Sequence, residues 1–131
     1  SGSVETDRRR QREVVEAFLA ASKAGDLEGL IAVLDPDVVV RGDAAAVKLG
    51  GHAEVVGAAA VADLFKGRAR TAVAGLVDGE VGVHVPVPRR MLLVFQVAFA
   101  DDGRIAAMDV VGDPAAIERL ALASLTDSSD D

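Results

Sequence analysis

Two aspartates, Asp109 and Asp43, are the acidic side chains in this sequence best suited to chemistry. Asp109 stands in an apolar run, and burial among hydrophobic residues raises the pKa of a carboxyl group. A carboxyl group with a pKa near the working pH is suited to act as a general base. We therefore take both aspartates as candidate catalytic residues, with His84 assisting. The alternative is structural: Asp109 would pair with Arg104 or a backbone amide, and Asp43 would form a turn after Gly42.

The two histidines give a weaker signal. His84 lies in a valine-rich strand pattern, where a hydrogen-bonded structural role is the alternative, and His52 lies in a predicted loop with no assigned role. They are far apart, have no carboxylate at ligand spacing, and the chain has no cysteine, so we expect no metal and no cofactor. The sequence also lacks a phosphate-binding glycine motif, a Gly-x-Ser-x-Gly motif and a helical His-Glu-x-x-His motif.

The element that must position Asp109 is a hairpin. Two apolar runs within residues 91–112 predict antiparallel strands around a turn that ends at Gly103. A two-residue turn would put Asp109 opposite Gln96. A three-residue loop with Gly103 in the left-handed conformation would move Asp109 to the face of Phe95, and we favour this second register. Both faces of the hairpin are largely apolar, so both need cover from helices, another sheet or another subunit.

The expected order is two helices, a strand, a helix and then a run of strands. The first half is expected to contain helices over 7–24 and 26–35, a strand at 38–40, a loop or irregular hairpin over 41–52, a strand at 54–56 and a helix over 57–65. The second half is expected to contain strands at 69–77 and 81–87 with a turn at 78–79 between them, then the hairpin, and a last helix from Pro114. The second helix would turn Leu27, Leu30, Ile31 and Leu34 inward. Strands gathered after helices predict an α+β fold in which a curved antiparallel sheet closes over three to four helices.

Length and charge define the class of protein. A chain of 131 residues suits one domain, which we place at residues 7–122, after a leader or cloning scar at 1–6 and before an acidic disordered tail at 123–131. No run approaches the roughly 20 apolar residues of a membrane helix, so we expect no membrane association. No secretion signal is visible and cysteine is absent, which fits a cytoplasmic protein. The net charge of −7 argues against direct nucleic acid binding.

Residues 18–27, 33–39 and 56–62, in this order, resemble the SnoaL-like family. Its members are cone-shaped α+β barrels related to the nuclear transport factor and ketosteroid isomerase group. One branch is closer: the C-terminal extension of actinobacterial extracytoplasmic-function RNA polymerase sigma factors. The segments that carry this closer resemblance are 41–47, 67–70, 74–79, 102–105 and 108–114.

The resemblance implies a regulatory domain of a longer protein, because the promoter-reading helical domains of a sigma factor are not among these residues. Such a domain would modulate transcription initiation by contacting the sigma-factor DNA-binding domains and RNA polymerase, with or without a small ligand in its cone. Contact between domains would then involve Arg41, Asp43 and Lys48.

The ligand pocket would be formed by Phe18, Gln96 and Phe95. The alternative functions are a polyketide-cyclase-like or isomerase-like enzyme, in which a pocket aspartate moves a proton, and a module that only binds a ligand or dimerises. The doubly apolar hairpin predicts a homodimer through the outer face of the sheet.

Overall fold

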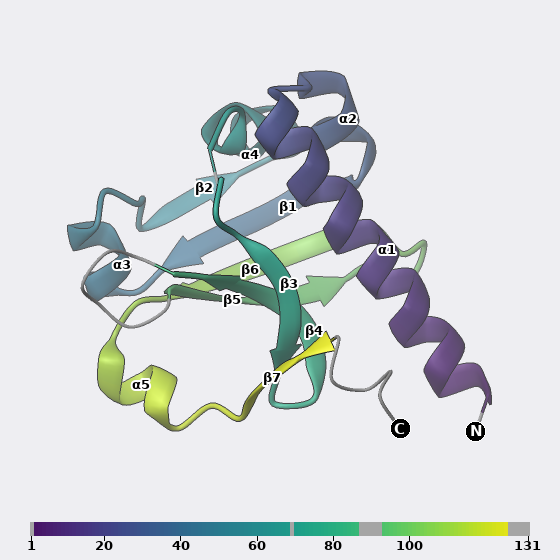
Figure 1. Ribbon diagram of the computed structural model, residues 1–131. Helices are drawn as coiled ribbons and strands as arrows, with labels where there is room; N and C mark the ends of the chain where they lie inside the picture. Colours follow the sequence, from purple (N-terminus) through teal and green to yellow (C-terminus); the bar gives the residue numbers. More distant parts are fainter. Residues whose placement is uncertain (1, 69, 87–92, 126–131) are drawn as a thin grey trace.

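The computed structural model describes residues 2–68, 70–86 and 93–125, which form a curved seven-stranded sheet with helices packed on it (Figure 1). The helices are α1 (Gly2–Ala24), α2 (Leu27–Ala32), α3 (Ala44–Lys48), α4 (Ala58–Phe65) and α5 (Pro114–Glu118). The strands are β1 (Leu34–Gly42), β2 (Glu54–Val56), β3 (Val73–Val77), β4 (Glu80–Val85), β5 (Leu93–Phe99), β6 (Ile105–Val111) and β7 (Leu122–Ser124). Their order in the sheet is β2-β1-β6-β5-β4-β3-β7. The predicted α+β class with a curved sheet is confirmed.

One strand pairing differs from the expectation of an antiparallel sheet. Strands β1 and β6 run parallel, whereas the other neighbouring strands are antiparallel. The β5–β6 hairpin fixes the direction of β6. Strand β1 arrives from α2 at the same end, where the Ile105 amide donates to the Val33 carbonyl over 2.9 Å. Both strands therefore start together, and the wholly antiparallel sheet predicted from the sequence is wrong at this pair.

Side chains alternate along each strand and so divide the sheet into two faces. We call inner the face that carries Val40, Val83 and Phe95, and outer the face that carries Val94 and Asp109. Helices α1, α2 and α4 contribute to the main hydrophobic core on the inner face; its largest fully buried members include Val15, Phe18, Leu30, Val38, Val61, Val83, Ile105 and Met108. The outer face has a separate, smaller cluster beneath α5, made of Val77, Val94 and Ile117 with Val111, Leu120 and Leu122.

The register of the β5–β6 hairpin follows from a loop and a bulge together. The loop has the expected three-residue form: Ala100 donates to the Arg104 carbonyl over 2.8 Å, and Gly103 has a φ of 92°. The pairing then shifts by one residue, leaving Ala106 as a bulge. Asp109 therefore lies opposite Gln96, so the favoured register, with Asp109 on the Phe95 face, is wrong.

The helices differ from prediction at their ends. Helix α1 begins at Gly2 rather than at residue 7, and its first residues overlap the predicted leader. Helix α2 has only six residues, because Leu34 already belongs to β1; Leu30 is buried, whereas Leu27 and Ile31 are each 38% exposed. The segment predicted as a loop or irregular hairpin over 41–52 contains the short helix α3.

The remaining differences concern strands. Strand β1 is longer than the predicted 38–40 and includes Pro36, while β3 begins at Val73 rather than at residue 69. Strand β4 ends at Val85, and the end of the predicted strand at 87, like residues 91–92 of the hairpin, lies outside the described residues. Strand β7 reaches Ser124, inside the predicted tail, of which residues 126–131 also lie outside the described part.

Candidate functional site

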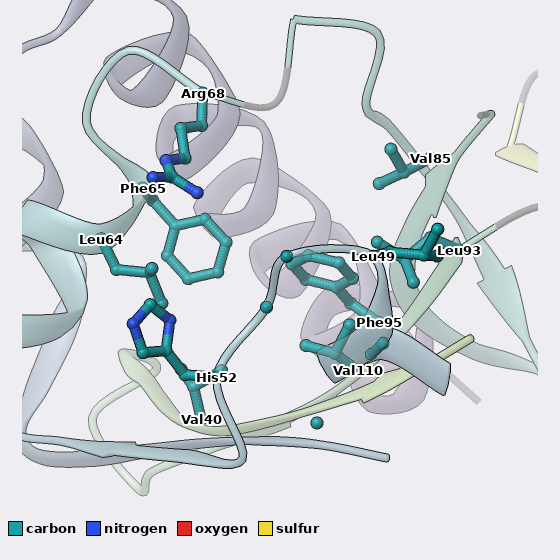
Figure 2. Close-up of a pocket in the computed structure, with 14 residues that line it drawn as sticks. Val40, Leu49, His52, Leu64, Phe65, Arg68, Val85, Leu93, Phe95 and Val110 are labelled. Atoms are coloured by element: carbon teal, nitrogen blue, oxygen red, sulfur yellow. The ribbon is translucent and has the colours of Figure 1, made fainter. Parts of the chain in front are cut away.

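An apolar pocket of about 250 Å³ opens on the inner face, beside α3 and α4 (Figure 2). Strands β1, β4, β5 and β6 supply one wall, α4 supplies a second, and α3 with the loop after it closes a third. The large apolar side chains that line it are Val40, Leu49, Leu64, Phe65, Val85, Leu93, Phe95 and Val110. The curvature of the sheet and the position of α4 thus create a space that the side chains do not fill.

Three aromatic rings connect the pocket to the core. The centroid of the Phe65 ring lies 5.7 Å from that of Phe95, which lines the pocket with it, and 5.1 Å from that of Phe18. Phe18 is only 1% exposed and supports Phe65 from behind, without lining the pocket. Gln96 points to the outer face, because it follows Phe95 in the strand. Of the three residues predicted for a ligand pocket, the structure brings one to the pocket and one behind it.

Two polar side chains, His52 and Arg68, line this pocket in the described part of the chain (Figure 2). Sequence reasoning missed both of them as functional residues. The only local signal for His52 is the Gly50-Gly51 pair before it, which marks a loop but no binding role. Arg68 lies in a segment that carried the family resemblance, yet nothing in its neighbours indicates a pocket.

Ser22 on α1 fixes the segment that carries Arg68. Its buried hydroxyl lies 2.5 Å from the carbonyl oxygen of Phe65 and 3.0 Å from that of Arg68, and the Gly67 amide donates to the Ser22 carbonyl over 2.8 Å. A buried serine commonly satisfies carbonyl groups at a helix end in this way. The turn after α4 is therefore anchored, and Arg68 starts from a fixed backbone position.

Asp43 lies beside the pocket but is occupied as a helix cap. Its carboxylate accepts from the amides of Ala46 at 2.8 Å, Gly112 at 3.1 Å and Asp113 at 3.1 Å. Burial alone would raise the pKa of Asp43, but the hydrogen bonds from Ala46, Asp113, Gly112 and Ala45 outweigh it and hold the pKa below the usual 3.8. Asp43 is thus charged near neutral pH, and its pKa is shifted away from that of a general base.

The other two catalytic candidates lie on the outer face. Asp109 is exposed, and its predicted partner Arg104 instead pairs with Asp102 at 2.8 Å. His84 Nε2 lies 3.0 Å from the Leu76 carbonyl oxygen. The His84 ring packs directly against Gly75, so that a Cβ atom added at Gly75 would lie only 2.5 Å from the ring. The structure therefore does not bring Asp109, Asp43 and His84 together.

The comparisons with known proteins concern the fold. No family model matches the chain, and no curated protein matches its sequence. Among solved structures, the extracytoplasmic function sigma factor SigJ of Mycobacterium tuberculosis superposes with a TM-score of 0.60 at 24% identity, over 80% of this chain and 43% of that one. A SnoaL-like protein of unknown function from Burkholderia thailandensis gives 0.57 at 16% identity, over 79% and 94%. A putative ketosteroid isomerase from Kribbella flavida gives 0.57 at 15%, over 82% and 80%.

This chain has a SnoaL-like fold. The predicted resemblance is confirmed at the level of the fold, which is also found in NTF2-like proteins. The chain spans less than half the length of the sigma factor with which it superposes.

The residues predicted for contact between domains gather at one end of the SnoaL-like sheet. Arg41 and Asp43 flank Gly42 at the end of β1. The Arg41 side chain forms an ion pair with Glu54 on the neighbouring strand β2, at 3.2 Å. Lys48 is exposed in the last turn of α3. Arg41 belongs to the outer face, whereas Asp43 caps the helix that borders the pocket. Lys48 thus lies in α3 and the other two residues lie just before it, but the three do not form a single cluster of contacts.

The chemistry that this SnoaL-like pocket offers is binding. Its walls are apolar, its polar side chains in the described residues are one guanidinium and one imidazole, and no carboxylate of those residues lines it. The described residues also contain no group of three or more acidic or histidine side chains that could hold a metal ion. Within the same described part, no helix is long and apolar enough to cross a membrane.

Proposed function

We propose that this chain is the SnoaL-like regulatory domain of an extracytoplasmic-function RNA polymerase sigma factor, where it modulates transcription initiation by contacting the other sigma domains. The observation that carries the proposal is the superposition on SigJ, which covers 80% of this chain but only 43% of the sigma factor. That proportion suits a domain attached to other parts. Direct DNA contact is not part of the proposal, since the chain has a net charge of −7.

Helix α3 is the proposed link between the pocket and the contact surface. Ala46 and the following Leu49 line the pocket, while Lys48 is exposed in the last turn of the same helix. A ligand in the pocket would therefore contact the element that carries Lys48. Because Asp43 ties the start of α3 to Gly112 and Asp113, this helix is held against the sheet.

A reconstituted transcription assay with the full-length protein tests the proposal. Deleting this domain is expected to change the yield of promoter-dependent transcript, and an unchanged yield would contradict the regulatory role. Lys48→Gln in the full-length protein is expected to shift the yield in the direction of the deletion. Lys23→Gln, which removes the same charge from the exposed end of α1, is the matched control and is expected to leave it unchanged.

The gene gives an independent test. Translating the coding sequence upstream of this chain is expected to reveal two helical domains of a sigma factor. A start codon near residue 1 would contradict the proposal.

The geometry gives less support to an isomerase-like or cyclase-like enzyme. Such an enzyme would need a carboxylate base in the pocket, but Asp43 is held as a cap with a lowered pKa, and Asp109 is on the opposite face. If Asp43→Asn or Asp109→Asn abolished turnover of a candidate substrate, the enzyme alternative would replace the regulatory one.

We also propose that the domain forms a homodimer through its outer face. Val56 is 58% exposed there and pairs in register with half-buried Val39, at the edge away from α5. Sedimentation velocity at micromolar concentration is expected to give a dimer that Val56→Glu dissociates, and a monomer at all concentrations would contradict this.

A further inference from the structure

We propose that the pocket binds a small apolar monocarboxylate, with its chain between α4 and the sheet and its carboxylate at Arg68 and His52. This inference rests on the proposed function in one respect, since it names the class of ligand to which a regulatory domain would respond. Its observations are the size of the pocket, the apolar side chains inside it and the charge at one wall.

Size and lining define the apolar part of the ligand. A dry cavity of about 150 Å³ accommodates benzene, and pockets for drug-sized ligands have volumes of about 300–1,000 Å³. The present volume of about 250 Å³ lies between these cases. Phe65 and Phe95 line the space together with aliphatic side chains of β1, β4 and β6. These features suit an unbranched chain of medium length or a single substituted ring.

Charge defines the polar end. A guanidinium carries five N–H donors and a positive charge. Among the described residues Arg68 forms no ion pair and has no carboxylate beside it in the pocket lining. The chain as a whole is acidic, with a net charge of −7, so its overall field repels anions. A preference for an acid over a neutral molecule must therefore come from Arg68 itself, with His52 as a second polar group.

The backbone around Arg68 supports this role. The buried Ser22 hydroxyl lies within hydrogen-bond distance of the Arg68 carbonyl, so α1 fixes the start of this long side chain. In Figure 2 the Arg68 side chain extends from its backbone toward Phe65, on the side where the pocket residues are drawn. The loop with His52 is fixed in turn, because the Gly51 amide donates to the Ala46 carbonyl over 3.0 Å. The backbone that carries both exposed side chains is therefore held at the rim of the pocket by contacts that a ligand need not provide.

Isothermal titration of the 131-residue chain with octanoate, octanol and octylamine tests the inference. Octanoate is expected to bind at one site at least about tenfold more tightly than octanol, because a charge-assisted hydrogen bond contributes that much, and octylamine is expected to bind most weakly. Affinity is expected to rise about fourfold for each CH₂ from hexanoate to octanoate. Equal affinity for octanoate and octanol, a flat length series or no saturable binding would overturn the inference.

Two matched variants test whether the preference for octanoate over octanol comes from Arg68. Arg68→Gln is expected to weaken octanoate binding about tenfold or more and to leave octanol binding unchanged. Arg70→Gln removes the same charge two residues away, outside the pocket lining, and is expected to bind octanoate like the wild type. Equal losses in the two variants would indicate a general charge effect and overturn the assignment.

The outcome of the octanoate titration can be distinguished from the outcome of the transcription assay. If deleting the domain alters transcription but octanoate does not bind, this inference fails and the proposed function stands. If octanoate binds as described but the deletion has no effect, the proposed function fails and the binding site stands. The thermal unfolding midpoint of Arg68→Gln, expected to equal that of Arg70→Gln in the absence of octanoate, shows that lost binding does not come from lost folding.

Discussion

Neighbouring residues of the same strands have unlike surroundings on the two faces of the sheet. On β6, Val110 lines the pocket while Asp109 is exposed on the other side; on β5, Phe95 and Gln96 differ in the same way. A shift of one residue would exchange these positions, because strand side chains alternate. The bulge at Ala106 therefore decides which side chains of β6 can meet a ligand.

The two faces also differ in how they are covered. The inner face carries the main core beneath α1, α2 and α4, whereas the described outer face has only the small cluster around Ile117 beneath α5. Part of the inner face stays open as the pocket. Substitutions that are alike in chemistry should therefore differ strongly in their effect between the faces.

The largest effect is expected at Phe18. Phe18→Ala removes a fully buried ring that packs at 5.1 Å against Phe65, and it should lower the free energy of unfolding by about 3–5 kcal/mol. Urea denaturation measures this change. Ile117→Ala is the counterpart on the outer face, with an expected loss of about 2–3 kcal/mol, since the smaller cluster can relax around it. A larger loss at Ile117 than at Phe18 would reverse the comparison.

Asp43 should give the next largest effect. Asp43→Ala removes the cap of α3 and leaves the Gly112 and Asp113 amides without their acceptor, at an expected cost of about 2–3 kcal/mol at pH 7.

The pH dependence of this loss has a definite sign. The folded state lowers the pKa of Asp43 below 3.8, so its contribution is fully present above that value and is lost as pH falls through the lower pKa of the folded state. The difference in unfolding free energy between wild type and Asp43→Ala should therefore shrink below about pH 4. A difference that stays constant down to pH 2 would contradict the capping role.

A smaller effect is expected at Ser22, which links α1 to the pocket wall. Ser22→Ala leaves the Phe65 and Arg68 carbonyl oxygens without this hydroxyl and should cost about 1–2 kcal/mol in urea denaturation. It should also weaken octanoate binding more than octanol binding, because Arg68 loses its fixed start. Equal weakening of both ligands would mean that Ser22 supports the pocket only as a whole.

The smallest effect is expected at Asp109. Asp109→Asn changes an exposed side chain of the outer face, so the free energy of unfolding should change by less than about 0.5 kcal/mol. Octanoate binding should be unchanged in calorimetry. A large loss of either would place Asp109 in the interior, as the register favoured from the sequence did.

The sequence alone was sufficient to predict the elements that local residue patterns define. The hairpin, the helix that became α4, and the turn at Asp78-Gly79 follow from apolar periodicity and turn residues; both turn residues have positive φ, 51° and 83°. The three-residue loop before Arg104 was also predictable, since Gly103 suits its left-handed position.

Features that depend on distant contacts could not be predicted in this way. Helix α3 has five residues and is capped by Asp43, whose other partners, Gly112 and Asp113, are 69 and 70 residues away. The bulge at Ala106 has no sequence mark, because alanine fits either a paired or a bulged position. The same holds for the site. Phe95 was expected in a pocket from the family resemblance, but His52 and Arg68 reach the pocket from two loops that only the complete fold brings together.

A map of ligand contacts by methyl NMR can distinguish the two faces, since leucine and valine methyl groups occur on both. During titration with octanoate, we expect shifts to concentrate on Leu49, Leu64, Leu93 and Val110 around the pocket. Methyl groups of Val39, Val56 and Val111 on the outer face should stay unchanged. Shifts centred on the outer-face group, or none on the pocket group at saturation, would contradict the claim that the inner-face pocket is the functional site.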